Sequence, residues 1–541
     1  MSQWKQIAAV VLTTLIVSAC TDETRSKVGG TIVISASADA DVLFPPRTLT
    51  LVGKQVTDQV FDNLADIGGD LNTVGDAGFT PRLAQRWRWG ADSLSVDFEL
   101  DPNARWHDGR AVTARDVQYT FHLIKDPALA SPLSSSTENV DSVSIVDSLT
   151  ARVWMREKRQ DAFFKIAQTV PVLPAHLLSE SSPAVLRGAQ FARTPVGSGK
   201  FRFSGWDRGA RIVLVADSSN YRGRPRVDRL VWLVSADYPA AVLRFLSGAA
   251  DFIDVLRPEY VAEAVAGGKE VRASPGSLDY GYVAFNLVDR KTGRPHPVLG
   301  EREMRRALVM SVDRAALVRN VFDTFGLVAH GPATRLMPTS DTTISLPFDT
   351  VRAARSLDSL GWLRGNDGIR RRGNVPLAFS LIVPSSSANR MKLAVLLQDQ
   401  WRKAGARVSV DPMELSTFGA RMEDRNFDAL LNAWHIDPTP SSVREEWAGS
   451  EIRPGGYNAS SYRSAAFDAV IDSATRDANP RRSVSLYRRA YRILAEDAPA
   501  MWLYELRNVH GVAKRITPTG IRPDVWWKSL DQWSVADTAA R

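Results

Sequence analysis

The 541-residue sequence contains a single cysteine, Cys20, and only seven histidines. With one cysteine near its start, the rest of the chain can form neither disulfides nor thiolate metal sites, so its stability must come from a packed core. The sequence contains no HExxH or GxSxG motif, no closely spaced histidine pair, and no GxGxxG turn after a strand. It therefore offers no motif for zinc-dependent, serine-dependent or dinucleotide-dependent catalysis.

Apolar runs long enough to span a membrane are also missing. The first apolar run, residues 7–17, follows Lys5 and precedes small residues. A helix rises 1.5 Å per residue, so this run is too short for ~30 Å of hydrocarbon. A positive start, a short apolar run and a small-residue end are typical of a secretory signal peptide. We predict a signal peptide over residues 1–19.

Residues 17–20, VSAC, resemble the lipobox of bacterial lipoproteins, whose cysteine is acylated and becomes the mature N-terminus. We therefore predict that Cys20 is lipidated and that residues 20–29 tether the protein to the cell membrane on its periplasmic, extracytoplasmic side. More than one acyl chain is needed for stable anchoring, and this modification supplies that. The alternative is a signal peptide cleaved after Ala19, with an incidental thiol at Cys20.

The remaining chain has the composition of a globular protein, with 44% hydrophobic and 24% charged residues. The net charge of +8 is spread along an exported chain, so we expect no nucleic-acid partner. Residues 31–35 form a β-branched run typical of a buried strand. Thr113 and Asp116 resemble a capping box, Gly405 closes a helix, and Asn479 opens another. Alternating strands and helices indicate a mixed α/β protein.

Residues 197–200, GSGK, are similar to part of a phosphate-binding loop. However, Thr194 replaces the first glycine of that motif, and Phe201 replaces the hydroxyl residue that would contact magnesium. We therefore predict no nucleotide site here.

Two segments carry a family resemblance: FTPRLAQRW at 79–87 and WHDGRAVTARDV at 106–117. They are similar to a signature of the family 5 extracellular solute-binding proteins, the peptide, nickel and oligosaccharide receptors of ABC importers. Further matches follow in the family's order: PVGSGKF at 195–201, NYRG at 220–223, AFN at 284–286, RRAL at 305–308, LGW at 360–362, WHIDP at 434–438 and GYN at 456–458. Lys200 departs from the pattern, which has proline there.

The resemblance implies an α/β, two-lobed periplasmic-binding-protein (Venus-flytrap) fold of the large class II, oligopeptide-binding type, with an extra N-terminal subdomain. Its implied limits are lobe I at 30–62, 191–280 and 506–541, the extra subdomain at 63–190, and lobe II at 281–505. We expect the strands at 280–286 and 502–506 to cross between the lobes.

The resemblance also implies ligand-binding residues. Asp437 matches an aspartate that pairs with the α-amino group of a bound peptide, and its neighbours Trp434 and His435 would line the pocket. Arg390 lies where dipeptide-binding relatives place an arginine for the C-terminal carboxylate. The loop of Gly197, Ser198 and Gly199 would bring backbone N–H groups near the ligand. For each residue a purely structural role stays open, such as a turn at Asp437 or a solvated Arg390.

The predicted function is capture of an oligopeptide-like solute for import by an ABC transporter, with the transmembrane permease subunits as partners. Alternative ligands are an oligosaccharide or a chelated metal such as nickel. We predict a monomer that is not an enzyme and has no cofactor or metal. The remote alternative is an exported hydrolase that uses scattered carboxylates, with Asp251, Asp254 and Asp437 as candidates.

Overall fold

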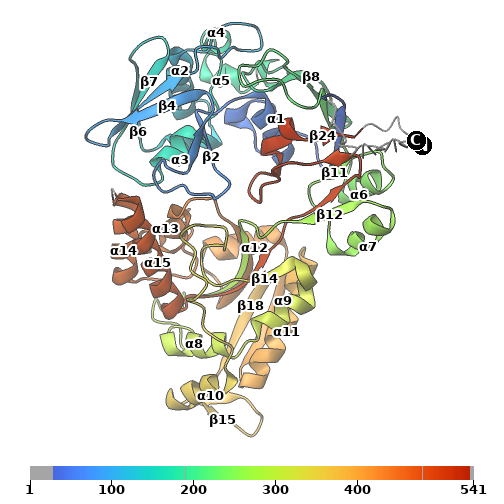
Figure 1. Cartoon of the computed structure of the whole chain (residues 1–541). Coiled ribbons are helices and arrows are strands. Elements are labelled where there is room, and N and C mark those ends of the chain that lie inside the picture. The colour runs from blue at the N-terminus through green and yellow to red at the C-terminus, as the bar shows by residue number, and fades with distance from the viewer. Residues whose placement is uncertain (1–27, 189, 478, 537–541) are drawn as a thin grey trace, which may run out of the picture.

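The structure, a computed structural model, describes residues 28–188, 190–477 and 479–536. The predicted signal peptide and Cys20 lie outside these residues. Figure 1 shows two bodies joined by a narrow connection: lobe I above and lobe II below. Within the described ranges, no helix combines the length and apolar character needed to cross a membrane.

Lobe I is built on a seven-stranded sheet. In spatial order its strands are β12 (Glu270–Ala273), β22 (Val509–Val512), β11 (Phe252–Ile253), β1 (Thr31–Ala36), β10 (Arg229–Val234), β9 (Arg211–Ala216) and β8 (Phe201–Asp207). The predicted strand at 31–35 is confirmed as β1, whose Ile32 and Ile34 are fully buried. The helices of this lobe are α1 (Leu51–Val60), α6 (Tyr238–Leu246) and α7 (Pro258–Ala266), with the 3-10 segment η6 (Trp526–Gln532) near the C-terminus.

A subdomain is inserted between α1 and β8, at the upper left of Figure 1. It contains a four-stranded antiparallel sheet and a two-stranded one. The strands are β4 (Ala84–Trp89), β5 (Ser95–Leu100), β7 (Thr150–Met155) and β6 (Val140–Ile145), with β2 (Ala65–Ile67) paired to β3 (Phe79–Pro81). The helices are α2 (Ala114–Lys125), α3 (Ala162–Ala167), α4 (Ala175–Leu178) and α5 (Pro183–Leu186). The predicted capping box is confirmed, because α2 starts after Thr113 and Asp116 caps its first turn.

Lobe II is built on a six-stranded mixed sheet. In spatial order its strands are β14 (Gly326–Val328), β21 (Ala500–Leu506), β13 (Asp279–Phe285), β20 (Ala429–His435), β18 (Ala378–Pro384) and β19 (Arg407–Met413). Its helices are α8 (Arg302–Met310), α9 (Arg314–Phe322), α10 (Thr350–Ser359), α11 (Ala388–Ala404), α12 (Leu415–Glu423), α13 (Ser441–Trp447), α14 (Ala465–Arg476) and α15 (Pro480–Asp497). A small three-stranded sheet joins β15 (Leu363–Arg364), β16 (Arg370–Arg372) and β17 (Val375–Pro376) at the lower tip of the lobe.

Two predicted helix boundaries in lobe II are confirmed. Gly405 ends α11 with φ +95°, a conformation that a residue with a Cβ rarely adopts. Asn479 caps α15, and Pro480 occupies its first turn, where no backbone donor is needed. The apolar stripe of α11 is fully buried at Leu393, Leu397 and Trp401. Local sequence therefore specifies these helices, and their buried stripes attach them to the sheet.

The two segments that connect the lobes differ from the predicted ones. Residues 274–278 link β12 of lobe I to β13 of lobe II, and residues 507–508 link β21 to β22. The strands proposed as crossings, 280–286 and 502–506, instead pair with each other inside the sheet of lobe II. They were misassigned because a buried apolar strand has the same pattern whether it ends at a connection or continues through it. Ser274 N–H donates to Asn508 O over 2.8 Å, so the two connections are bonded to each other.

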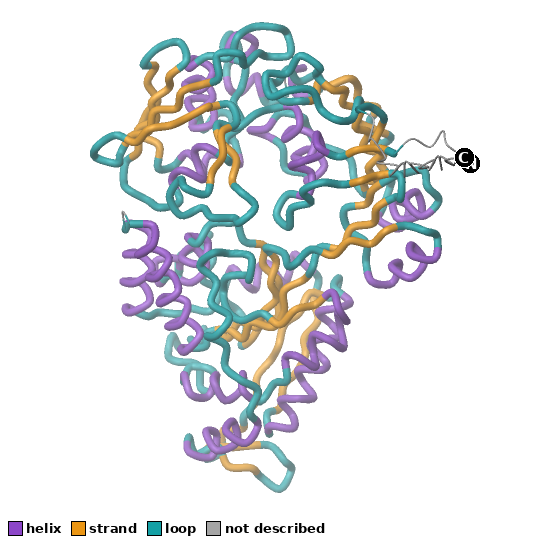
Figure 2. The backbone as a smooth tube through the Cα atoms, viewed as in Figure 1, coloured by secondary structure: helices purple, strands orange, loops and turns teal. Residues whose placement is uncertain are grey.

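The subdomain also contacts lobe II directly. Asp161 Oδ2 accepts a 2.6 Å hydrogen bond from Ser441 Oγ, and Gln160 N–H donates to Thr475 O over 2.9 Å. The smooth trace in Figure 2 shows the subdomain above the helices α13–α15. We call these Gln160 and Asp161 contacts the subdomain latch. The domain limits drawn from the sequence stay a prediction.

Candidate functional site

The carboxyl ends of three parallel strands of lobe II lie on the side of the connections. Strand β18 runs parallel to both β19 and β20. At its end, β20 pairs with the start of β13, with His435 opposite Asp279, and Ile436 N–H donates to Leu278 O over 3.0 Å. Leu278 belongs to a connection to lobe I, so this edge of the sheet faces lobe I. Ligands of open α/β sheets bind at such carboxyl ends.

Trp434 and His435 are the last residues of β20. Trp434 is half-buried, and its ring packs edge-to-face against Tyr457 at 5.3 Å between centroids. His435 Nδ1 lies 2.9 Å from Asp279 Oδ1. This hydrogen bond to the carboxylate raises the pKa of His435, because it stabilises the imidazolium form. The strand end thus combines a half-buried tryptophan, an exposed tyrosine and a histidine that is hydrogen-bonded to a carboxylate.

Asp437 follows β20 by two residues and is exposed to solvent. Its negative charge contributes to the raised pKa of His435, which places the two side chains within electrostatic reach. Its carbonyl oxygen accepts a 2.6 Å hydrogen bond from Thr439 N–H, which forms the turn at Pro438. Within the described ranges, Asp437 makes no ion pair of its own. The carboxylate is therefore available to a cationic group.

Arg390 lies in the first turn of α11, after the carboxyl end of β18. Its Nη1 donates a 3.2 Å hydrogen bond to Asn432 Oδ1 of β20. This bond directs the guanidinium toward the central strand and leaves further donors for an anion. The edge of the sheet therefore carries a cation at Arg390 and an anion at Asp437, together with a half-buried tryptophan.

Three neighbours in this edge were not predicted from the sequence: Asn432, Asp279 and Tyr457. Asn432 positions Arg390, Asp279 pairs with His435, and Tyr457 covers Trp434. Tyr457 stands in the matched segment GYN, which was a usable signal. The pairing of residue 279 with residue 435 depends on strand register between distant segments, for which the sequence carries no local signal.

The predicted glycine loop lies in lobe I, apart from these residues. Its glycines allow close contact with α1, since a Cβ at Gly197 would meet Val60 O at 1.8 Å and one at Gly199 would meet Gln59 O at 2.3 Å. Gly199 N–H donates to Val60 O over 2.8 Å. The two glycines are therefore required for packing, whether or not a ligand is bound.

Ser198 is fully buried, and its hydroxyl donates to Asp62 Oδ2 over 3.2 Å. Asp62 also accepts hydrogen bonds from Arg82 and Arg222. These two cations hold the pKa of Asp62 below its usual value despite burial, so the carboxylate stays charged. The side chain of Ser198 serves this internal network.

The carboxylates considered for a hydrolase are not brought together. Asp251 is buried in lobe I and pairs with Arg515 at 2.5 Å. Asp254 lies in the same lobe and accepts from Gln55 over 3.3 Å, whereas Asp437 belongs to lobe II. In the described part of the chain, no group of three or more histidine, aspartate or glutamate side chains is arranged to hold a metal ion.

Comparison with known proteins identifies the family. The profile of the bacterial extracellular solute-binding proteins, family 5, matches residues 78–452. The oligopeptide-binding protein AppA of Bacillus subtilis is 26% identical over 451 residues, 82% of this chain and 81% of the relative. Protein XP55 of Streptomyces lividans is 28% identical over 488 residues, 90% of this chain and 85% of the relative.

Solved structures show the same fold. AppA from Bacillus subtilis in complex with a nonapeptide aligns with a TM-score of 0.73 at 23% identity, covering 95% of this chain and 100% of that one. NikZ from Campylobacter jejuni in complex with Ni(L-His) aligns with a TM-score of 0.72 at 21% identity, covering 93% and 99%. The two-lobed α/β fold predicted from the sequence is confirmed. The chain belongs to the family 5 bacterial extracellular solute-binding proteins.

Proposed function

We propose that this protein captures an oligopeptide-like solute between its lobes and delivers it to the transmembrane subunits of an ABC importer. The observation that carries the proposal is the edge of the lobe II sheet, where Asp437 and Arg390 offer opposite charges beside Trp434. A peptide is a zwitterion with an ammonium and a carboxylate, and charge-assisted contacts at both ends would orient it. Relatives named as oligopeptide-binding and ABC transporter peptide-binding proteins support this ligand class.

Capture would use movement about the two connections. Residues 274–278 and 507–508 are short segments next to the strand ends, so small backbone changes there would reorient the lobes. The subdomain latch, which joins Asp161 to Ser441, forms only when the lobes are close. A ligand that contacts both lobes would favour this closed arrangement, because its additional contacts exist only there.

We further propose that the protein acts outside the cytoplasm as a monomer, anchored through lipid on Cys20. The family assignment and the sequence of residues 1–20 support this placement. Labelled fatty acid supplied to expressing cells would be incorporated into the wild-type chain and not into Cys20→Ser. Equal labelling of both chains would contradict the lipid anchor.

Calorimetry with a panel of short peptides tests the ligand class. We expect saturable binding that Asp437→Asn and Arg390→Gln each weaken by about 10- to 100-fold, the effect of one charge-assisted hydrogen bond. The matched controls are Asp424→Asn, an exposed carboxylate of the same lobe, and Arg402→Gln on the same helix. They make the same changes of charge and should bind like the wild type.

The same panel includes oligosaccharides and a nickel–histidine chelate. Binding of a sugar or of the chelate, with no heat from any peptide and with the protein folded, would replace the peptide assignment by one of those alternatives. Peptide binding unaffected by both site variants would move the site away from the edge of the lobe II sheet.

A further inference from the structure

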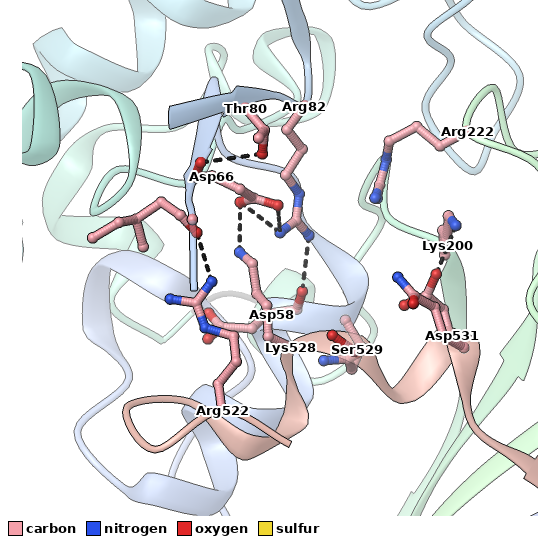
Figure 3. Close-up of a pocket in the computed structure, with 14 residues that line it drawn as sticks. Asp58, Asp66, Thr80, Arg82, Lys200, Arg222, Arg522, Lys528, Ser529 and Asp531 are labelled. Atoms are coloured by element: carbon pink, nitrogen blue, oxygen red, sulfur yellow. Dashed lines mark hydrogen bonds and ion pairs between the residues drawn. The ribbon is translucent and has the colours of Figure 1, made fainter. Parts of the chain in front are cut away.

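A cavity of about 320 Å³ lies between lobe I and its inserted subdomain, away from the edge of the lobe II sheet, and shares Arg82 and Arg222 with the Asp62 network. It opens where the end of α1, the strands β2 and β3, and residues 522–532 meet (Figure 3). Its basic side chains are Arg82, Lys200, Arg222, Arg522 and Lys528. Its carboxylates are Asp58, Asp66 and Asp531. The volume is within the range of small-molecule sites.

The carboxylates of this cavity already accept hydrogen bonds from the protein. Asp66 lies 3.1 Å from Arg82 Nη1 and 2.5 Å from Lys528 Nζ. Asp531 accepts from Lys200 Nζ over 2.6 Å. The positive neighbours lower the pKa of Asp66 well below its usual value, so it is ionised at neutral pH. A ligand with donor groups would have to compete for these oxygens.

Two of the five basic side chains use their donors within the protein. Arg82 donates to Asp62, to Asp66 and to backbone carbonyl oxygens at the end of α1. Arg522 donates to Asp524 and to a backbone carbonyl of β2. These arginines form the wall of the cavity and hold its segments together.

The other three basic side chains, Lys200, Lys528 and Arg222, have N–H donors that make no hydrogen bond within the described residues. An ammonium group has three N–H donors, but Lys200 and Lys528 each make one hydrogen bond within the described ranges. Arg222 donates from Nη2 to Asp62, and its Nε is buried with no partner in the described residues. Figure 3 shows Arg222 and Lys200 on one side of the cavity and Lys528 on the other. The cavity thus has unused donors on three cations, while each of its carboxylates is already paired with a cation.

Because these donors are shielded from water, an anion would interact with them more strongly than in solvent. The side chain of Lys528 is 12% exposed, and burial together with the charge of Arg82 lowers its pKa to about 8, although Asp66 and Asp58 act in the opposite direction. An added negative charge near Lys528 would therefore stabilise its ammonium form. Lys200 stands where the family pattern has proline, so part of this donor excess is a departure of this chain from the family.

We propose that this cavity binds a small anionic group, a carboxylate or a phosphate, through Arg222, Lys200 and Lys528. A carboxylate or phosphate oxygen accepts several hydrogen bonds, so it can use the N–H donors that Asp62, Asp531 and Asp66 leave free on these three cations. The site is independent of peptide binding at lobe II. It would bind acidic solutes that carry no free ammonium group.

Titration of the purified full chain with inorganic phosphate and with glutarate, at constant ionic strength in chloride, tests the proposal. We expect saturable binding of at least one anion, with a rise in the thermal midpoint. Binding of phosphate alone assigns a phosphoryl group, and binding of glutarate alone assigns a carboxylate. Absence of saturable binding for both would overturn the proposal.

Variants locate the site. Arg222→Gln should weaken binding at least about tenfold. Lys403→Gln, which removes an exposed ammonium from α11, should leave it unchanged. Asp531→Asn releases Lys200 and should tighten binding. Equal affinity for the anion in all three variants would refute the assignment of the binding site to this cavity.

The wild type gives a check that does not depend on any variant folding. Glutarate stays doubly charged from pH 7 to 9, while Lys528 loses its proton near pH 8. Affinity for glutarate should fall by up to about tenfold over this range. A constant affinity would exclude Lys528 from the site.

Discussion

Glu446 is a carboxyl group in the core of lobe II, on α13, with 4% of its surface exposed. Its Oε2 accepts a hydrogen bond from Tyr280, while Oε1 has no partner among the described residues. Burial raises the pKa of Glu446 to about 7, and the nearby Tyr280, Tyr282 and Trp447 only partly offset the effect. An acid in these surroundings favours its neutral form.

The shift predicts how stability depends on pH. Between its ordinary pKa of 4.5 and about 7, Glu446 holds its proton in the folded state and loses it in the unfolded state. The folded state then binds more protons, so the free energy of unfolding falls as pH rises through this range and levels off above pH 7. At 1.36 kcal/mol per pKa unit, the total loss is about 3 kcal/mol.

The substitution Glu446→Gln keeps the shape of the side chain and removes its ionisable group. We expect the variant to be as stable as the wild type near pH 4.5 and more stable by about 3 kcal/mol at pH 8. Urea unfolding at several pH values, taken as the difference between the two proteins, cancels all other titrating groups. Glu445→Gln is the control, since this neighbouring carboxylate is half-exposed and pairs with Lys165 at 3.5 Å. A difference in unfolding free energy between wild type and variant that stays constant from pH 5 to 8 would show that Glu446 does not titrate in this range.

Three further predictions concern the packing and closure of the lobes. Gly197→Ala should destabilise lobe I by more than about 3 kcal/mol, because its Cβ would overlap Val60 O, and the midpoint of urea unfolding would show this. Arg82→Met should cost about 3–5 kcal/mol in the same assay, since the fully buried Asp62 and the partly buried Asp66 lose their common partner; wild-type stability would contradict it. Asp161→Ala removes the bond to Ser441 and should shift the protein toward an open form, seen as a larger radius of gyration in solution scattering without ligand.

Much of the architecture was predictable because its signals are local. The β-branched run of β1, the capping box at Thr113 and the glycine that ends α11 each act within a few residues. Ordered motifs from residue 79 to residue 458 indicated the family, which the family comparison confirms. Asp437 was inferred from one of these motifs and Arg390 from the position of an arginine in dipeptide-binding relatives, and their contact with ligand stays a prediction.

The connections between the lobes were placed on the wrong residues for a physical reason. The strands at 280–286 and 502–506 are buried on both faces, so their apolar pattern gives no indication of where the sheet ends. Strand β13 begins at Asp279, which pairs with His435 at the end of β20, and register between segments this far apart is a property of the whole fold.

The helices, strands, caps and turns could be located from the sequence, because propensity, periodicity and capping act over short distances along the chain. By contrast, the folded structure was needed to see that Asn432 orients Arg390 and that Lys200, Arg222 and Lys528 surround one cavity. Lys528 lies far along the chain from Lys200 and Arg222, and the charges of these three side chains interact only once the fold brings them together. The donor excess that they create is therefore a property of the fold and of no single motif.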